Sequence, residues 1–376
     1  MAEYLTNTAE LTAVANAIRE KGGTSEQLAC PDGFVAAIRA IQTGVPLQIA
    51  VATNAGATVT ATKGSKTVSG TADTSGHCTL TVDEAGTWTV TAATASTTKT
   101  SDVVVGISNV NLLPFDPVLN NYSWEAIKKV SDAGQGENYW SIGDTKTITI
   151  NGKVGNTTFS NLSVDAFILG FNHNASREGS NRIHFQIGKI NGTLVGLVDG
   201  NYGKNTSTTG AFTMYTSYTN SGGWNNSNMR KTVLGSNSTS ATSPASNTLL
   251  AALPADLRAV MKPATKYSDN TGGGSDTASY VTSTTDYLFL LSEFEYLGAR
   301  KVANSAEKNY QAQYDYYKAG NSKIHYKHNA TGTEAKVWCR SVSSGGWGTW
   351  CNLTTDGRSN SYPANYSFGV APGFCV

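Results

Sequence analysis

Hydrophobic and polar residues repeat with a helical period at the start of the chain. Leu11, Val14 and Ile18 are spaced three or four residues apart, and a second set with the same spacing follows between residues 34 and 41. This pattern predicts two short amphipathic helices within residues 1–45. Helices of this length cannot bury enough apolar surface to be stable alone. Residues 1–45 therefore form either a helical cap on the next domain or a segment that assembles with its own copies or docks on a partner.

From residue 46 to residue 106 the period becomes two. Apolar and polar residues alternate in short segments separated by Gly, Asn or Asp, namely LQIAVAT, ATVTAT, KTVSGTA, HCTLTVD, GTWTVTA and SDVVVG. About six short strands within a few tens of residues predict a small all-β sandwich. The segment resembles bacterial immunoglobulin-like modules, and this resemblance implies an immunoglobulin-like β-sandwich that serves as a spacer.

Residues 107–376 mix helical and strand patterns without a regular alternation of the two. SWEAIKKV and NTLLAALPADLRAVM predict helices, DAFILGFNHN and RIHFQIG predict strands, and TDYLFLLSEFEYLG predicts a strand that leads into a helix. In TKTITINGKV, the pair Asn151-Gly152 is typical of a two-residue hairpin turn. Together these patterns predict an α+β domain with long loops.

The last residues of this region are apolar. Phe368, Val370, Phe374 and Val376 fall at even spacing, which predicts a strand with one buried face. Pro372 lies within this run. Since proline has no N–H group to donate, it favours an edge strand or a bulge over a central strand.

The composition narrows the possible partners. Of 376 residues, 28 are Lys or Arg and 27 are Asp or Glu, which gives a net charge of +1. This balance gives no reason to expect nucleic acid or an anionic membrane as a partner. The longest apolar segments are too short to cross a bilayer, and no basic segment followed by an apolar one opens the chain, so we expect no signal peptide and synthesis in a cytoplasm. The five cysteines are scattered and contain no CxxC pair, which favours reduced, buried thiols.

Several phrases in residues 107–376 match a domain that is common in phage tail proteins and bacterial surface proteins. They include SWEAIKKVSDAGQGENYWSIGDTKTITINGKV, GGWNNSNMR, LPADLRAVMKPATKYSDNTGGG and the final NYSFGVAPGFCV. Residues 1–45 likewise resemble the N-terminal segment of many phage tail proteins. The ending is also similar to the last strand of the C-type-lectin-like fold of formylglycine-generating enzymes. That resemblance implies a C-terminal α+β domain of this fold, with its last strand in the central sheet beside its first.

The segment before the final strand has the composition of a binding site. Between Trp338 and Gly369 the chain consists mostly of small, polar and aromatic residues, which are typical of adaptable binding surfaces. In similar phage proteins, retroelements diversify this part of the domain by mutation at adenines. The resemblance therefore makes residues 342–366 a candidate variable region in which Trp347 and Trp350, which do not arise from asparagine codons in this way, belong to the scaffold. The candidate ligand-binding residues are Ser343, Ser344, Trp347, Thr349, Trp350, Asn352, Arg358, Asn360, Tyr362, Asn365 and Tyr366.

These resemblances imply a multidomain tail-fibre or tail-tip protein of a phage virion, which recognises a protein or glycan on the host cell surface. Residues 1–45 would contact other tail proteins, residues 46–106 would act as a spacer, and residues 107–376 would bind the ligand. A homotrimer is expected because tail fibres are usually trimeric. We expect no catalytic residue, no cofactor, no bound metal and no insertion into a membrane.

An enzyme is the main alternative. Formylglycine-generating enzymes bind copper through two cysteines, and Cys339 and Cys351 are the pair at a comparable position, although the surrounding motif is absent. His325 and His328 are three residues apart, a spacing that binds metal from a helix. Their segment is predicted as a strand or loop, so we interpret them as surface histidines. A glycan-acting or metal-dependent enzyme, or a bacterial surface adhesin, stays open at this point.

Overall fold

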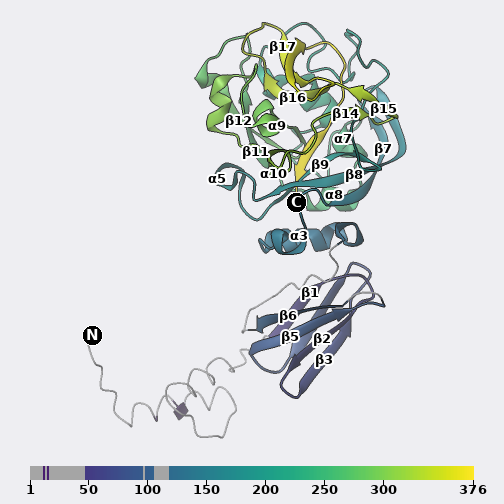
Figure 1. Cartoon of the computed structure of the whole chain (residues 1–376), viewed down its shortest axis with the longest axis vertical. Helices are drawn as coiled ribbons and strands as arrows, with labels where there is room; N and C mark the ends of the chain where they lie inside the picture. The colour runs from purple at the N-terminus through teal and green to yellow at the C-terminus, as the bar shows by residue number, and fades with distance from the viewer. Residues whose placement is uncertain (1–11, 13–14, 17–46, 96–97, 106–117) are drawn as a thin grey trace, which may run out of the picture. The chain divides into compact units, whose positions relative to one another are not determined.

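The computed structural model describes residues 12, 15–16, 47–95, 98–105 and 118–376. The chain forms two compact units, residues 1–117 and residues 118–376 (Figure 1). The helices predicted in residues 1–45 lie outside the described residues, except that positions 12, 15 and 16 are helical. The predicted boundary at residues 106 and 107 lies outside them as well. Within the described part of the chain, no helix is both long enough and apolar enough to cross a bilayer.

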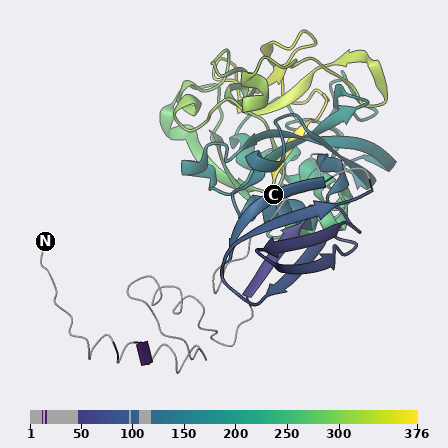
Figure 2. The same cartoon turned by 60° about the horizontal axis from the view of Figure 1, so that its bottom comes forward.

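The described part of the N-terminal unit is a small β-sandwich, as the alternating pattern predicts. Its strands are β1 (Leu47–Ala52), β2 (Thr58–Lys63), β3 (Lys66–Thr71), β4 (His77–Val82), β5 (Gly86–Ala93) and β6 (Thr98–Val105). One sheet pairs β1 with β4, and the other has the order β3-β2-β5-β6 (Figures 1 and 2). Residues of both sheets meet in one hydrophobic core. At its centre Trp88 is fully buried and donates its indole N–H to the carbonyl oxygen of Glu84.

An eight-stranded sheet forms the centre of the C-terminal unit. Its strands are β7 (Thr145–Val154), β8 (Thr157–Phe171), β9 (Ile183–Ile190), β10 (Thr193–Gly196), β13 (Phe289–Leu290), β14 (His325–Lys327), β15 (Ala330–Ala335) and β19 (Pro372–Cys375). The order β13-β19-β9-β10-β14-β15 is extended by the β7–β8 hairpin, which joins through β8 to β9. Two smaller sheets complete the unit: β11 (Ala264–Asp269) with β12 (Val281–Asp286), and β16 (Val337–Val342) with β17 (Thr349–Leu353) and β18 (Ser359–Pro363).

Short helices surround these sheets, and the unit is richer in strands than the predicted α+β domain. The helical segments are η1 (Leu119–Asn121), α3 (Trp124–Asp132), α4 (Gly136–Tyr139), α5 (Ala175–Glu178), α6 (Gly223–Asn226), η2 (Met229–Leu234), α7 (Leu249–Ala252), α8 (Ala255–Val260), η3 (Ala278–Tyr280), α9 (Glu293–Leu297), η4 (Ser305–Asn309) and α10 (Asp315–Lys318). α3 confirms its prediction, and Ser123 caps it by accepting a hydrogen bond from the Ala126 N–H. Pro254 directly precedes α8, and this agrees with the expectation that it lies near a helix start or a kink.

The prediction of a hairpin turn at Asn151-Gly152 is wrong. β7 continues through both residues with a bulge, and Gly155 and Asn156 form the two-residue turn into β8. Gly155 has a φ of 57°, and a Cβ atom there would lie 2.0 Å from the carbonyl oxygen of Gly210. Gly155-Asn156 is itself a favoured two-residue turn pair, with glycine at the first position. The sequence therefore contains two turn signals close together, and the second one is used.

The apolar final segment forms a strand of the central sheet, but not where it was expected. β19 lies between β13 and β9, whereas β7, the first strand of the unit, pairs only with β8 among the described strands. The predicted pairing of first and last strands is therefore wrong. Pro372 is the first residue of this interior strand rather than part of an edge or a bulge, a position at which proline is tolerated.

Candidate ligand-binding surface

Residues 342–366 form most of the sheet β16–β17–β18, which lies at the end of the C-terminal unit away from α3 (Figure 1). β17 is the central strand and pairs antiparallel with both neighbours. Trp338 and Trp350 are buried beneath this sheet, and the Trp338 indole donates a hydrogen bond to the carbonyl oxygen of Phe212. Buried anchors of this kind hold loops in place while exposed side chains on them are free to bind.

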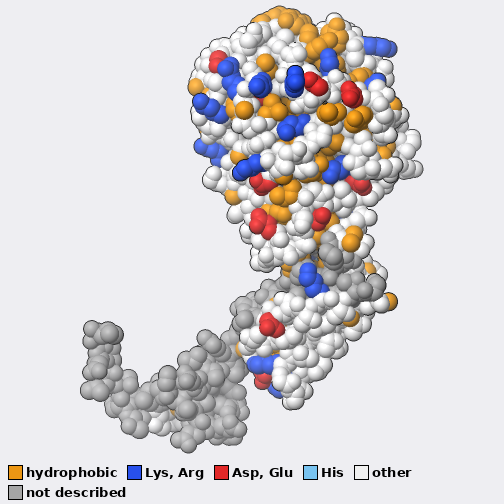
Figure 3. All heavy atoms as spheres, in the orientation of Figure 1, with side chains coloured by type: hydrophobic (Ala, Val, Ile, Leu, Met, Phe, Trp, Pro, Cys, Tyr) orange, Lys and Arg blue, Asp and Glu red, His pale blue; other side chains and the backbone are white. Residues whose placement is uncertain are grey.

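An exposed aromatic pair lies at the connection between β16 and β17. Trp347 is 59% exposed and Tyr218 is 46% exposed. Their ring centroids are 5.7 Å apart in an edge-to-face arrangement. In Figure 3, hydrophobic side chains gather on the surface at this end of the unit. Large aromatic side chains that stay exposed together are typical of surfaces that bind a partner or ligand.

Asn220 fixes the loop that carries this pair. Its side chain is fully buried, and its amide donates hydrogen bonds to the carbonyl oxygens of Gly346 at 3.0 Å and Thr349 at 3.2 Å. Gly348 lies so close to Tyr218 that a Cβ atom there would be 2.9 Å from the tyrosine ring. The loop conformation is therefore determined by contacts on both sides of the exposed tryptophan.

A second aromatic group continues from the end of β18. The ring centroid of Tyr362 is 4.9 Å from that of Tyr366 and 4.8 Å from that of Phe368. The ammonium group of Lys336 lies 4.3 Å from the centroid of the Tyr362 ring, a cation–π geometry. Both tyrosines are half-buried, so part of each ring packs against the protein and the remainder is open to a ligand.

The predicted ligand-binding residues differ in how far they reach the surface. Those exposed are Trp347, Arg358 and Asn360, and those half-buried are Ser344, Thr349, Tyr362, Asn365 and Tyr366. Ser343, Trp350 and Asn352 are buried, and the prediction is corrected for these three. Trp350 and Asn352 are buried because they belong to β17, which is covered on both faces: all of its residues after the first are buried. Tyr218 was missed, although its segment TSYTNSGG has the same mixture of small, polar and aromatic residues.

A buried cluster of charged side chains raises the question of a metal site. His173, Glu178 and Glu295 bring potential ligand atoms within 4.8 Å of one another. Lys266 lies between the two carboxylates, with its Nζ 2.5 Å from Glu178 Oε2 and 3.1 Å from Glu295 Oε1. Arg340 forms two hydrogen bonds to the same Glu295 carboxylate. Because these cations already supply the positive charge that a metal ion would bring, the cluster is a structural ion network.

Most of the residues considered for an enzyme are buried. Cys339 and Cys351 are fully buried free thiols, and burial raises the pKa of each well above its usual value. At neutral pH both are protonated and therefore poor nucleophiles. The surface position predicted for His325 and His328 is wrong. His325 is fully buried beside the carbonyl oxygen of Lys323, and His328 is half-buried.

The stability of the C-terminal unit is expected to fall on acidification. Burial lowers the pKa of His173 to about 3, that of His325 to about 4, and that of His184 well below its usual value. Unfolded histidine titrates near pH ~6.5, so below this pH the unfolded chain binds protons that the folded unit does not. Burial also lowers the pKa of His328. Glu307 and Glu178 act in the opposite direction because burial raises the pKa of each carboxyl, that of Glu307 to about 7. Four histidines oppose two carboxyls, and we expect the free energy of unfolding to be lower at pH ~5.5 than at pH ~7.5.

Urea unfolding of the full chain at these two pH values measures the difference. Tryptophan fluorescence is the suitable signal, since six of the seven tryptophans belong to residues 118–376. A His325→Asn variant should lose part of the pH dependence because it removes one of the three buried histidines. An unfolding free energy that is equal or higher at the lower pH would contradict the expectation.

A family model matches part of the chain. Residues 207–376 match a family described as "Domain of unknown function (DUF6273)". No curated protein matches the chain. The matched region contains β16, β17 and β18 and the exposed tryptophan, but it begins after β10. Since β19 pairs with β9 of the preceding segment, the matched region and residues 118–206 build one compact unit in this protein.

Proposed function

We propose that the protein is a phage tail-fibre or tail-tip component that binds a ligand on the host cell surface through its C-terminal unit. The observation that best supports this proposal is the exposed pair of Tyr218 and Trp347. Both rings extend from segments held by the buried Asn220 and by close backbone packing. A rigid aromatic surface loses little conformational entropy when a ligand binds to it.

The other parts of the chain have roles that agree with this proposal. Residues 1–45 would attach to other tail proteins and assemble a homotrimer. The β-sandwich would be an immunoglobulin-like spacer, and the C-terminal unit would be a C-type-lectin-like domain. Diversification of residues 342–366 would act on exposed positions such as Arg358 and Asn360. A reverse transcriptase gene and a near-copy of the DNA for this segment beside the gene would support diversification, and their absence would indicate fixed specificity.

Replacing Trp347 by alanine is expected to weaken ligand binding by at least about tenfold, because exposed aromatic anchors commonly contribute about 2 kcal/mol or more. The labelled full chain is first screened on bacterial strains and on a glycan array to find a binding target. The affinities of the unaltered chain and of the Trp347→Ala variant for that target are then compared.

Ile142→Ala is the matched control, since Ile142 is also apolar and is 40% exposed in the same unit. This variant should bind as the unaltered chain does. If Trp347→Ala binds normally, or if both variants lose binding equally, the aromatic pair is not the binding surface. A chain that binds no cell and no glycan would instead be a purely structural tail component.

A further inference from the structure

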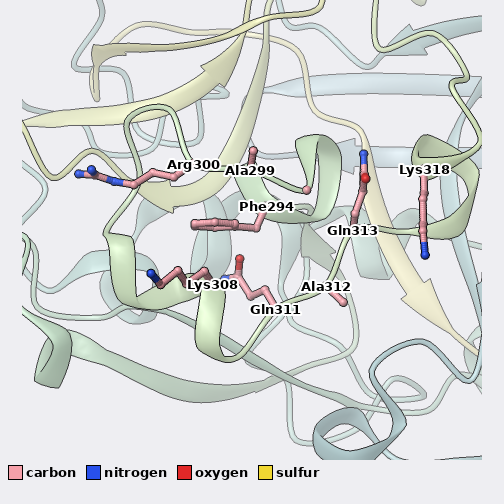
Figure 4. Close-up of a pocket in the computed structure, with 9 residues that line it drawn as sticks. Phe294, Ala299, Arg300, Lys308, Gln311, Ala312, Gln313 and Lys318 are labelled. Carbon is pink, nitrogen blue, oxygen red and sulfur yellow. The ribbon is translucent and has the colours of Figure 1, made fainter.

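A pocket of about 470 Å³ lies between the end of α9 and the segment from η4 to α10. Figure 4 shows the ring of Phe294 in its middle. Phe294 is only 5% exposed and forms an apolar floor. The polar groups around this floor come from Arg300, Lys308, Gln311, Gln313 and Lys318. We refer to this site as the Phe294 pocket.

The Phe294 pocket is positively charged. Three cationic side chains line it, and no Asp or Glu does. Arg300 is partly neutralised by Asp276, at 3.2 Å. Lys308 and Lys318 are exposed, and neither forms an ion pair with a residue that the structure describes. In a chain with a net charge of only +1, two unpaired lysines around one pocket favour an anionic ligand.

The arrangement of the two lysines indicates how the anionic groups of such a ligand are spaced. In Figure 4, Lys308 is drawn near the Phe294 ring, whereas Lys318 lies at the far end of the lining, beyond Gln313. A single small anion would reach one of them, whereas a chain with repeated anionic groups would reach both. Phe294 contributes a small apolar floor to the pocket, since only 5% of the residue is exposed, and an apolar C–H edge of a sugar ring fits against such a floor.

The amide groups of the pocket are held in place by the protein. Gln311 donates hydrogen bonds to the carbonyl oxygen of Tyr267 and to Oε2 of the buried Glu307. Gln313 donates to the carbonyl oxygen of Tyr296 at 3.0 Å. The site is thus built on fixed side chains around its floor, and only the lysines need to be ordered by a ligand.

The pocket is also connected to the loop that carries the exposed tryptophan. Arg300 Nη2 donates a hydrogen bond to Ser344 Oγ at 2.9 Å, and the Ser344 N–H donates to the carbonyl oxygen of Val302 at 2.9 Å. Ser344 precedes Trp347 by three residues in the same loop. One wall of the pocket is therefore hydrogen-bonded to the loop that carries Trp347.

We propose that the Phe294 pocket binds an acidic saccharide, that is, a carbohydrate chain with repeated carboxylate or phosphate groups. The anionic groups pair with Lys308 and Lys318, and an apolar edge of a sugar ring meets the Phe294 floor. This proposal adds the chemical class of the ligand to the proposed function. It rests on the proposed function only in taking the saccharide to belong to a cell surface.

Calorimetric titration of the full chain tests the proposal with three oligomers of equal length. One is a galacturonic acid oligomer, one is a hexose phosphate oligomer and one is neutral maltose-type oligosaccharide. At least one charged oligomer should bind and the neutral one should not, and comparison of the two charged oligomers identifies carboxylate or phosphate as the preferred group. The double variant Lys308→Gln/Lys318→Gln should lose about tenfold or more in affinity, since each charged hydrogen bond contributes on the order of a tenfold factor.

Lys301→Gln is the matched control, because Lys301 is exposed on the neighbouring loop and does not line the pocket. This variant should bind the charged oligomer normally. The proposal is overturned if neither charged oligomer binds, if the neutral oligomer binds equally well, or if the double variant keeps full affinity. Cell binding that is lost in Trp347→Ala but retained in the lysine double variant would leave the proposed function intact and reject this inference alone.

Discussion

Replacing Arg340 by alanine is expected to destabilise the C-terminal unit by about 3–5 kcal/mol, the usual cost of removing one partner from a buried ion pair. The guanidinium is 1% exposed and donates hydrogen bonds to Ser268, to the carbonyl oxygen of Leu290 and to both carboxylate oxygens of Glu295. Its loss would leave Glu295 buried with only Lys266 as a charged partner. Urea unfolding followed by tryptophan fluorescence measures this change.

Arg358→Ala serves as the control for the same residue type. The Arg358 side chain is 84% exposed and pairs with Asp356 at 3.4 Å, so its replacement should change the free energy of unfolding very little. The double variant Arg340→Met/Glu295→Gln should lose less free energy of unfolding than the sum of the losses in the two single variants. The reason is that no unpaired charge remains when both partners are replaced. Equal effects of Arg340→Ala and Arg358→Ala would show that the ion network does not stabilise the unit.

Helices and strands could be predicted from the sequence where buried and exposed residues recur with a single period over several positions. In the N-terminal unit each of the six expected strands is present, because Trp88 and its neighbours alternate with exposed threonines along β5. α3 was found for a similar reason, since Trp124, Ile127 and Val130 lie on one buried face of a capped helix. In both cases the local pattern and the tertiary structure require the same conformation.

Features that depend on contacts between distant segments could not be predicted. The aromatic pair combines Trp347 with a tyrosine from a loop more than one hundred residues earlier. The burial of Trp350 depends on the place of β17 between β16 and β18. Composition indicated a segment that carries exposed aromatic and polar residues, but it did not separate the exposed side chains from the buried ones.

The Phe294 pocket illustrates the same limit. Its lysines lie in ordinary polar segments, KNYQAQ and YYKAGN, which carry no binding motif. They line the same pocket as Phe294, where α9 ends at Gly298 and the chain turns away from the helix. Gly298 has a φ of 67°, a left-handed conformation that favours glycine. Such a site can be recognised only from the three-dimensional arrangement of the loops.

Replacing Phe374 by alanine is expected to cost about 3–5 kcal/mol, which approaches the whole stability of many domains. The side chain is fully buried in β19. Its ring stacks on that of Phe185 at 5.2 Å and meets the edge of Trp124 at 5.9 Å. The substitution therefore removes contacts that join β19 to β9 and to α3, and the melting temperature should fall sharply.

Trp347→Ala provides the contrast for this prediction. Trp347 is a larger aromatic residue in the same unit, but it is 59% exposed and its ring contacts only Tyr218 among the described aromatic rings. Its removal should leave the melting temperature nearly unchanged while ligand binding is lost. If Trp347→Ala instead unfolds the unit, or if Phe374→Ala melts normally, the division between a buried scaffold and an exposed binding surface is incorrect. If Phe374→Ala lowers the melting temperature and Trp347→Ala does not, the exposed residues can be replaced without loss of the fold. This is the physical condition for a binding site that varies between related proteins.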